Sequence, residues 1–223
     1  MNPDLPPLLS GLLCVDDPFD VARQAAADGV DGGLLPWRPL PDAVQGAIVL
    51  APDMALRRAM AALPAAMVGM QNALGSIGPS EVGILLDWDG GVRVNGARCG
   101  GFRVAASGRD PAAEPDWLVI GWSLPLVWPD GQEGGTTPDE TVLYDEGLTL
   151  APVDIVSAWG RHSMFWLGDL DSRQGRAALA REWQGLCRGL GEGGFAGVDE
   201  DFGRLDRRDG RTVLTPLTAL LED

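Results

Sequence analysis

The sequence contains no lysine, because all 17 of its basic residues are arginines. No side chain of this chain can therefore form a lysine Schiff base or accept an acyl group on a lysine amine. The 32 aspartates and glutamates give a formal net charge of −15, which disfavours nonspecific attraction to nucleic acids and to anionic membranes. We therefore expect no nucleic acid and no membrane partner.

Cysteine, histidine and long apolar runs are also scarce. Cys14, Cys99 and Cys187 form no Cys-x-x-Cys pair and are odd in number, which argues against a disulfide framework and a zinc site. We expect them to be small buried side chains. The single histidine, His162, belongs to no cluster of possible metal ligands. No apolar segment reaches 18 residues, and the first residues lack the basic region of a secretion signal, so we expect a cytoplasmic protein.

What is present is a globular composition, with 45% hydrophobic and 22% charged residues in 223. Asp17 and Pro18 predict the start of a helix that stops at Gly29, and a helix broken at Pro64 is predicted over residues 53–79. Helices are also predicted at residues 137–147, 151–168 and 172–191. Strands are predicted at residues 32–39, 46–52, 81–88, 91–95, 97–107 and 117–124, and three short ones within 193–223.

Consecutive strands followed by consecutive helices favour an α+β architecture. We predict a mixed, largely antiparallel sheet with helices on one face, followed by a small all-β module. The domain boundaries that we expect are residues 1–190 and 191–223.

Residues 87–101, DWDGGVRVNGARCGG, combine features of a binding hairpin. Trp88 stands between two aspartates, two tight turns follow, and Gly100 and Gly101 form a small-residue corner. This stretch resembles the hairpin of the biotin and lipoate protein ligases. In that family a Lys-Trp-Pro-Asn-Asp segment precedes a strand, a glycine turn, a basic pair and a Gly-Ile-Leu corner. Trp88, Gly96, Arg98 and Gly101 stand at the family's tryptophan, turn glycine, second basic residue and corner glycine.

The resemblance covers roughly residues 17–221. Residues 19–37 are similar to the family's first helix and strand, 117–127 to its Gly-Ile-Gly-Ile-Asn-Val-Asn strand, and 194–210 to its SH3-like C-terminal domain. It implies a class II synthetase-like catalytic fold and the use of ATP with Mg²⁺ and of biotin or lipoate. In such ligases a carboxylate is activated as an acyl adenylate and passed to a lysine of an acyl-carrier domain protein.

Two departures bear on that chemistry. Asp87 stands where the family has its hairpin lysine, and residues 40–45 replace the family's Gly-Arg-Gly-Arg loop. The family's two strand asparagines also fall on Pro125 and Val127. A unit charge about 4 Å from a phosphate contributes roughly 4 kcal/mol at an effective dielectric constant of 20, so lysine-to-aspartate exchange turns attraction into repulsion.

Two hypotheses follow, and no catalytic residue is assigned in either. In the first, the protein is a divergent ligase or acyltransferase that binds a small carboxylate or acyl adenylate and could pass the acyl group to a carrier lysine. In the second, it is a catalytically inactive binding or regulatory protein that keeps the ligase fold.

The candidate ligand-binding residues each have a structural alternative. Trp88 is either a pocket wall or ordinary core, and Arg98 either contacts an anion or forms a surface salt bridge. Gly100 and Gly101 let the backbone approach either a ligand or a neighbouring strand. Asp87 and Asp89 are an acid–base or metal-binding pair, or solvated turn charges.

The remaining candidates are polar residues expected near the cleft. Arg38 and Arg103 are arginines that could replace the missing lysine. Gln71 and Asn72 are polar residues in an otherwise apolar helix, so they need partners inside the protein or in the cleft.

Overall fold

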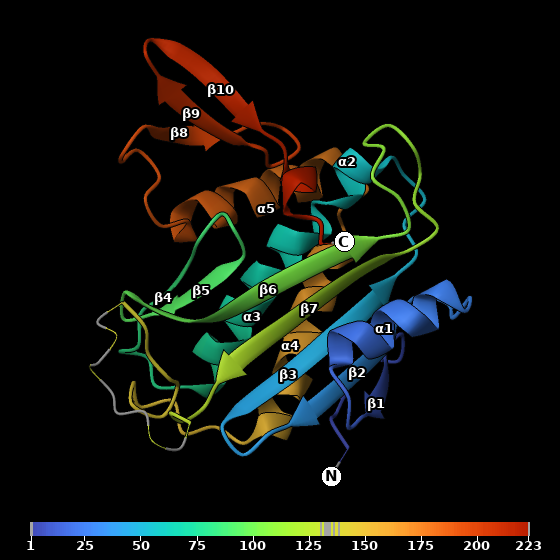
Figure 1. Ribbon diagram of the computed structural model, residues 1–223, viewed down its shortest axis with the longest axis vertical. Coiled ribbons are helices and arrows are strands. Elements are labelled where there is room, and N and C mark those ends of the chain that lie inside the picture. Colours follow the sequence, from blue (N-terminus) through green and yellow to red (C-terminus); the bar gives the residue numbers. More distant parts are fainter. Residues whose placement is uncertain (1, 130, 132–134, 136, 138, 223) are drawn as a thin grey trace.

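A seven-stranded sheet with helices on both faces forms the body of the molecule, and a three-stranded sheet follows at the C-terminal end (Figure 1). The computed structural model describes residues 2–129, 131, 135, 137 and 139–222. The large sheet has the strand order β1-β2-β3-β7-β6-β5-β4. Its strands are β1 (Ser10–Leu13), β2 (Leu34–Pro39), β3 (Ala43–Leu50), β4 (Ile84–Leu86), β5 (Gly91–Val94), β6 (Ala97–Ala106) and β7 (Leu118–Pro125).

All neighbouring strands in this sheet are antiparallel except β1, which runs parallel to β2. Helices α3 (Ala62–Ile77) and α4 (Pro152–Leu167) pack together against one face. Helix α2 (Leu56–Ala59) precedes α3, and α5 (Arg173–Leu186) follows α4. The α+β class with a largely antiparallel sheet is therefore confirmed.

Helix α1 (Pro18–Ala27) lies on the opposite face from α3 and α4 (Figure 1). Successive residues of a strand point to opposite faces. Ile48 accordingly belongs to the large core with α3 and α4, whereas Ala47 and Val49 pack with Phe19 of α1. The expectation of helices on one face thus holds for α3 and α4. The Asp17 carboxylate caps α1 as expected, accepting from the Phe19 N–H at 2.9 Å.

Three local expectations differ from the structure. The helix predicted over residues 53–79 breaks at Met60 and Ala61, and Pro64 lies in the first turn of α3, where its missing N–H removes no intrahelical bond. Strand β1 was not predicted. The expected helix at 137–147 is wrong for the described residues, which form turns and an isolated bridge between Arg98 and Glu140; the rest of that segment lies outside the described residues.

The small C-terminal sheet consists of β8 (Phe195–Val198), β9 (Arg204–Arg208) and β10 (Arg211–Thr215), all antiparallel, as the sequence predicts. The chain then passes through the 3-10 helix η1 (Leu217–Leu220) and returns to the large sheet, where Leu221 bridges Val104. Within the described part of the chain, no helix has both the length and the hydropathy to cross a bilayer.

Candidate functional site

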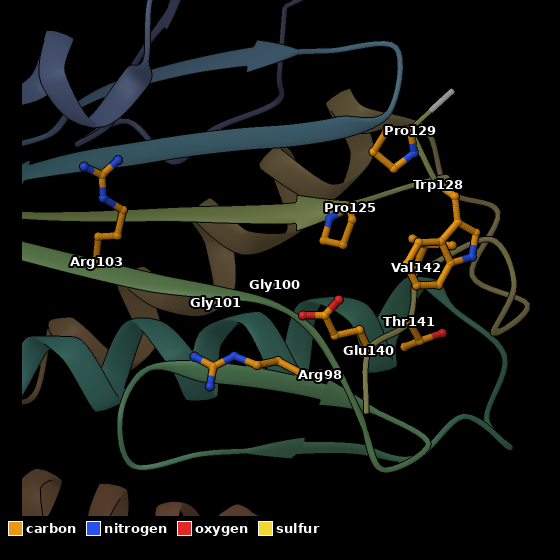
Figure 2. A pocket seen from close by; sticks show the side chains of 10 residues that line it. All are labelled: Arg98, Gly100, Gly101, Arg103, Pro125, Trp128, Pro129, Glu140, Thr141 and Val142. Carbon is orange, nitrogen blue, oxygen red and sulfur yellow. The ribbon is translucent and has the colours of Figure 1, made fainter. Parts of the chain in front are cut away.

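A pocket of about 450 Å³ lies against the sheet where β6 and β7 meet the segment that follows β7 (Figure 2). Strand β6 contributes two arginines and the glycine corner, whereas β7 and the following segment contribute mostly apolar side chains. The lining residues are Arg98, Gly100, Gly101, Arg103, Pro125, Trp128, Pro129, Glu140, Thr141 and Val142. The pocket thus brings together four of the residues predicted from the sequence, namely Arg98, Gly100, Gly101 and Arg103.

The pocket lies on the face of the sheet that α1 covers in part. Arg38, Gln45, Ser123 and Gly101 are in register across β2, β3, β7 and β6, and therefore share that face. The Arg38 Nε donates to the Gln45 Oε1 at 2.7 Å, and the Gln45 Nε2 donates to the Ser123 Oγ at 3.2 Å. Arg38 itself is not a lining residue, but it begins a hydrogen-bonded row that leads to the glycine corner.

Arg98 is held at the pocket by carboxylates of the preceding turn. Its Nη1 lies 3.1 Å from the Asp89 carboxylate and 3.9 Å from that of Asp87. The Arg98 side chain is 40% exposed and that of Asp89 is 54% exposed, so both stay in contact with water. Arg98 is therefore a surface ion pair and a pocket-lining cation at once.

Arg103 is fixed more firmly than Arg98. Its Nη1 lies 3.2 Å from the Asp17 carboxylate, and its Nη2 lies 3.0 Å from that of Glu222. Its guanidinium also stacks 4.3 Å from the centre of the Phe19 ring. The hydrogen bond to Glu222 raises the pKa of Arg103, against the opposing effect of burial. The start of α1 and the C-terminal segment thus position this cation together.

Asp87 is paired inside the hairpin. The Arg93 Nε lies 2.8 Å from both Asp87 carboxylate oxygens, and both side chains are less than a fifth exposed. Asp87 is therefore neither a free carboxylate nor a fully solvated turn charge. Residues 87–90 form a turn in place of the expected end of a strand, and the Asp87 N–H donates to the Gly91 carbonyl at 2.8 Å.

The glycine corner is required by the packing of the strands. A Cβ on Gly100, whose φ is +80°, would lie 2.0 Å from the Ser123 carbonyl oxygen, and a Cβ on Gly101 would lie 2.9 Å from the Gly90 carbonyl oxygen. The strand-packing alternative thus accounts for both glycines, and their role toward a ligand stays a prediction.

Three predicted residues lie away from the pocket, on the other side of the sheet. Trp88 is buried in the large core, and its indole N–H donates to the Phe202 carbonyl at 2.9 Å. Asn72 accepts from the Trp166 indole at 2.8 Å and donates to Gln71 at 2.7 Å, which ties both amides to the packing of α3 on α4. The sheet separates these side chains from the pocket. The polarity of Gln71 and Asn72 within an apolar helix therefore did not indicate a position in the pocket.

Sequence reasoning missed the wall formed after β7. The Arg98 N–H donates to the Asp139 carbonyl at 2.8 Å, and the Thr141 N–H donates to the Arg98 carbonyl at 2.9 Å. The Thr141 hydroxyl donates to Glu146 at 2.6 Å. The two backbone bonds of Arg98 join segments about 40 residues apart in the chain and leave no local pattern that could have predicted them.

The thiols contribute no reactive group to the pocket. All three cysteines are free, Cys99 and Cys187 are buried as expected, and Cys14 is half-buried. Burial raises the pKa of the Cys99 and Cys187 thiols to about 12. Among the described residues, no group of three or more histidines, cysteines, aspartates or glutamates is arranged to hold a metal ion.

Comparisons with known proteins agree with this architecture. The family model described as "Biotin/lipoate A/B protein ligase family" matches residues 5–185. A biotin protein ligase-like protein of unknown function from Silicibacter sp. TM1040 is 46% identical, with a TM-score of 0.93 and 100% of both chains covered. A search of curated proteins found no match.

More distant solved structures share the fold. The biotin protein ligase from Aquifex aeolicus in complex with biotin and ATP is 15% identical with a TM-score of 0.68, covering 93% of this chain and 96% of the other. The enzyme from Leishmania major in complex with biotinyl-5-AMP is 13% identical with a TM-score of 0.56, covering 94% and 98%. The match over residues 5–185 extends across most of the large sheet and its helices, and this chain belongs to the biotin/lipoate A/B protein ligase family.

Proposed function

We propose that this protein is a divergent ligase of its family that binds a small carboxylate, or the corresponding acyl adenylate, in the pocket at Gly100 and Gly101. The observation that carries the proposal is the joint presence of Arg98 and Arg103 in one pocket with an apolar wall (Figure 2). The Aquifex and Leishmania proteins with this fold bind biotin, ATP or biotinyl-5-AMP, which supports the same class of ligand here.

Arg98 is the cation best suited to receive the anionic group. Its pair with Asp89 is exposed, and exposed ion pairs contribute only about 0–1 kcal/mol. A hydrogen bond between charged groups in a less solvated site contributes about 1.5–3 kcal/mol, so a bound carboxylate competes with Asp89. The acyl chain would lie along Pro125, Trp128 and Val142.

ATP is the expected co-substrate of the activation step. The negative charge of Asp87 would repel its phosphates, so the pairing of Asp87 affects how well ATP binds. Because Arg93 lies 2.8 Å from both Asp87 oxygens, the repulsion expected between Asp87 and a phosphate is partly cancelled. The described residues offer no cluster of carboxylates for a metal ion. An Mg²⁺ ion would therefore be bound mainly through the phosphates of the nucleotide.

The acceptor of the acyl group must be a separate molecule if it is a lysine, since this chain has none. We propose a lysine of an acyl-carrier domain protein. Biotin and lipoate are the two acids to test first.

The test is isothermal titration calorimetry with a nonhydrolysable biotinyl-adenylate analogue, followed by biotin, lipoate and octanoate with and without Mg-ATP. We expect binding of the analogue, weakened about tenfold to a hundredfold by Arg98→Gln, because one charge-assisted hydrogen bond is lost. Arg181→Gln, an exposed arginine on α5 outside the pocket, is the matched control and should not change the affinity.

Absence of binding across the whole panel would remove the proposal. Binding of the analogue without ATP-dependent acylation of any carrier protein would instead favour the second hypothesis, a binding protein that has kept the fold.

A further inference from the structure

A second cavity, of about 650 Å³, lies between the large sheet's helices and the C-terminal sheet. Helix α2 contributes Arg57 and Arg58, and helix α5 contributes Arg173 and Arg176. The turn between β8 and β9 contributes the carboxylates of residues 199–201. Figure 1 shows α5 alongside the C-terminal sheet, and α2 lies near one end of α5. The cavity shares no lining residue with the pocket at Gly100.

The concentration of arginines is unusual for this chain. Four of its 17 arginines line one cavity, although the net charge of the protein is −15. Only Arg57 has an ion pair with a described carboxylate here, at 3.8 Å from Asp201. Arg58 and Arg173 have no described carboxylate within 4.0 Å, whereas Arg93 lies 2.8 Å from its partner in the hairpin. The cavity therefore holds guanidinium groups that the protein itself pairs only weakly.

The carboxylates of the turn are already engaged or crowded. The Asp199 carboxylate accepts from the N–H groups of Asp201 at 3.0 Å and Gly203 at 2.7 Å, so it holds the turn together. Burial, together with Asp199 and Glu200, raises the pKa of Asp201, against the opposing effect of Arg57 and Arg58. The Asp201 carboxylate lies 3.8 Å from the Arg57 Nε, beyond hydrogen-bond distance, so an incoming anion could displace it.

On the other wall Arg176 is positioned by the main chain. The Arg176 Nη1 donates to the Leu170 carbonyl at 2.7 Å and to the Asp171 carbonyl at 3.2 Å, which anchors it beside the start of α5. Arg173 is the first residue of α5, where the helix dipole adds positive potential. Ala177 and Ala180 are the only apolar lining residues among those described, so the cavity offers no ring on which a base could stack.

We propose that this cavity binds a small phosphorylated anion, a phosphate or diphosphate group, between the arginines of α2 and those of α5. The planar guanidinium donates two parallel N–H groups that match the oxygens of a phosphate. The anion replaces Asp201 at Arg57 and bridges the two helices. The site is independent of the acyl pocket and of the activity proposed there.

The test is calorimetric titration of the full chain with pyrophosphate, and with inorganic phosphate, at low ionic strength. The double variant Arg58→Gln/Arg173→Gln removes two exposed guanidinium groups and is expected to weaken pyrophosphate binding at least tenfold. Arg181→Gln, which removes one positive charge from α5 outside the cavity, and Arg98→Gln in the pocket at Gly100 are expected to leave the affinity unchanged.

The proposal fails if the wild-type chain does not bind pyrophosphate at millimolar concentration. It also fails if Arg181→Gln weakens binding as much as the double variant, which would indicate a general charge effect. Loss of binding in Arg98→Gln alone would place the anion in the acyl pocket and would likewise overturn the proposal. Circular dichroism of each variant establishes that it is folded.

Discussion

At the scale of single residues, Asp87 has the largest consequence. The resemblance of the hairpin to the ligases places it at the family's lysine position, and its charge is balanced by Arg93 at 2.8 Å, with Arg98 at 3.9 Å. Two arginines of the hairpin therefore lie within 4 Å of the Asp87 carboxylate. Replacing Asp87 with the family's residue would place three cations together.

We predict that Asp87→Lys destabilises the protein and does not raise ligase activity. The largely buried Asp87 carboxylate is lost, and the Arg93 guanidinium is left without its partner. This should lower the free energy of unfolding by about 1–3 kcal/mol. Urea denaturation measures the free energy of unfolding. Asp87→Asn is the control, because it removes the charge and keeps the size and shape of the side chain. A stable Asp87→Lys variant with increased ATP-dependent acylation would contradict this account of the hairpin.

Gly100 offers a second test at this scale. Gly100→Ala forces a Cβ to within 2.0 Å of the Ser123 carbonyl oxygen at a φ of +80°, so we expect a loss of at least about 1–3 kcal/mol in the free energy of unfolding. Gly108→Ala is the matched control, because nothing lies within 4 Å of a Cβ there. Equal stability of the two variants would show that β6 and β7 can separate at this corner at little cost.

At the scale of elements, the turn between β4 and β5 connects the large sheet to the C-terminal sheet. The Trp88 indole donates to the carbonyl of Phe202, which adopts a positive φ of 63° in the turn between β8 and β9. The backbone N–H of Arg188 also donates to the Leu86 carbonyl at 2.8 Å. The hairpin thus contributes to the stability of the C-terminal sheet from the face opposite the pocket at Gly100.

We predict that Trp88→Phe lowers the midpoint of thermal unfolding, since it leaves the buried Phe202 carbonyl without its donor at a cost of about 1–3 kcal/mol. Trp117→Phe, a change of the same size at a half-buried position beside α1, controls for the loss of volume. Differential scanning calorimetry compares the two. If both variants unfold at the same temperature, the hydrogen bond contributes little to holding the C-terminal sheet.

At the scale of the whole molecule, the buried thiols make stability depend on pH in the alkaline range. The pKa of Cys99 and of Cys187 is raised to about 12 in the folded chain, against an ordinary value of 9.0. The unfolded chain therefore releases these protons first as the pH rises. Their contribution to stability is complete below pH 9 and is lost between about pH 9 and 12.

We expect the free energy of unfolding to fall above pH 9 by up to about 1.4 kcal/mol per pH unit for each thiol. Urea denaturation at a series of pH values measures the slope, and the double variant Cys99→Ala/Cys187→Ala should flatten it. In the native state near pH 8, Cys14 should be the only thiol that reacts with a water-soluble disulfide reagent. Rapid reaction of all three thiols would show that the cores around Cys99 and Cys187 open readily.

The local elements of this protein follow from its sequence. Asp17 and Pro18 mark the start of α1, and Asn95 and Gly96 form the turn between β5 and β6 with positive φ angles. The short apolar runs of β3 and β7 identify buried strands. Caps, turns and periodicity depend on neighbouring residues alone, so they can be predicted without a structure. The resemblance of the hairpin and its flanking segments to the biotin and lipoate ligases, taken in their shared order, was also sufficient to predict the family.

Only the tertiary structure decided what surrounds the pocket at Gly100 and which charges are free. The bonds from Arg98 to Asp139 and from Arg103 to Glu222 join distant parts of the chain, and the sheet places Asn72 on the side away from the pocket. Such contacts depend on how strands and helices pack, not on neighbouring residues. For the same reason, the convergence of arginines from α2 and α5 cannot be predicted from the sequence.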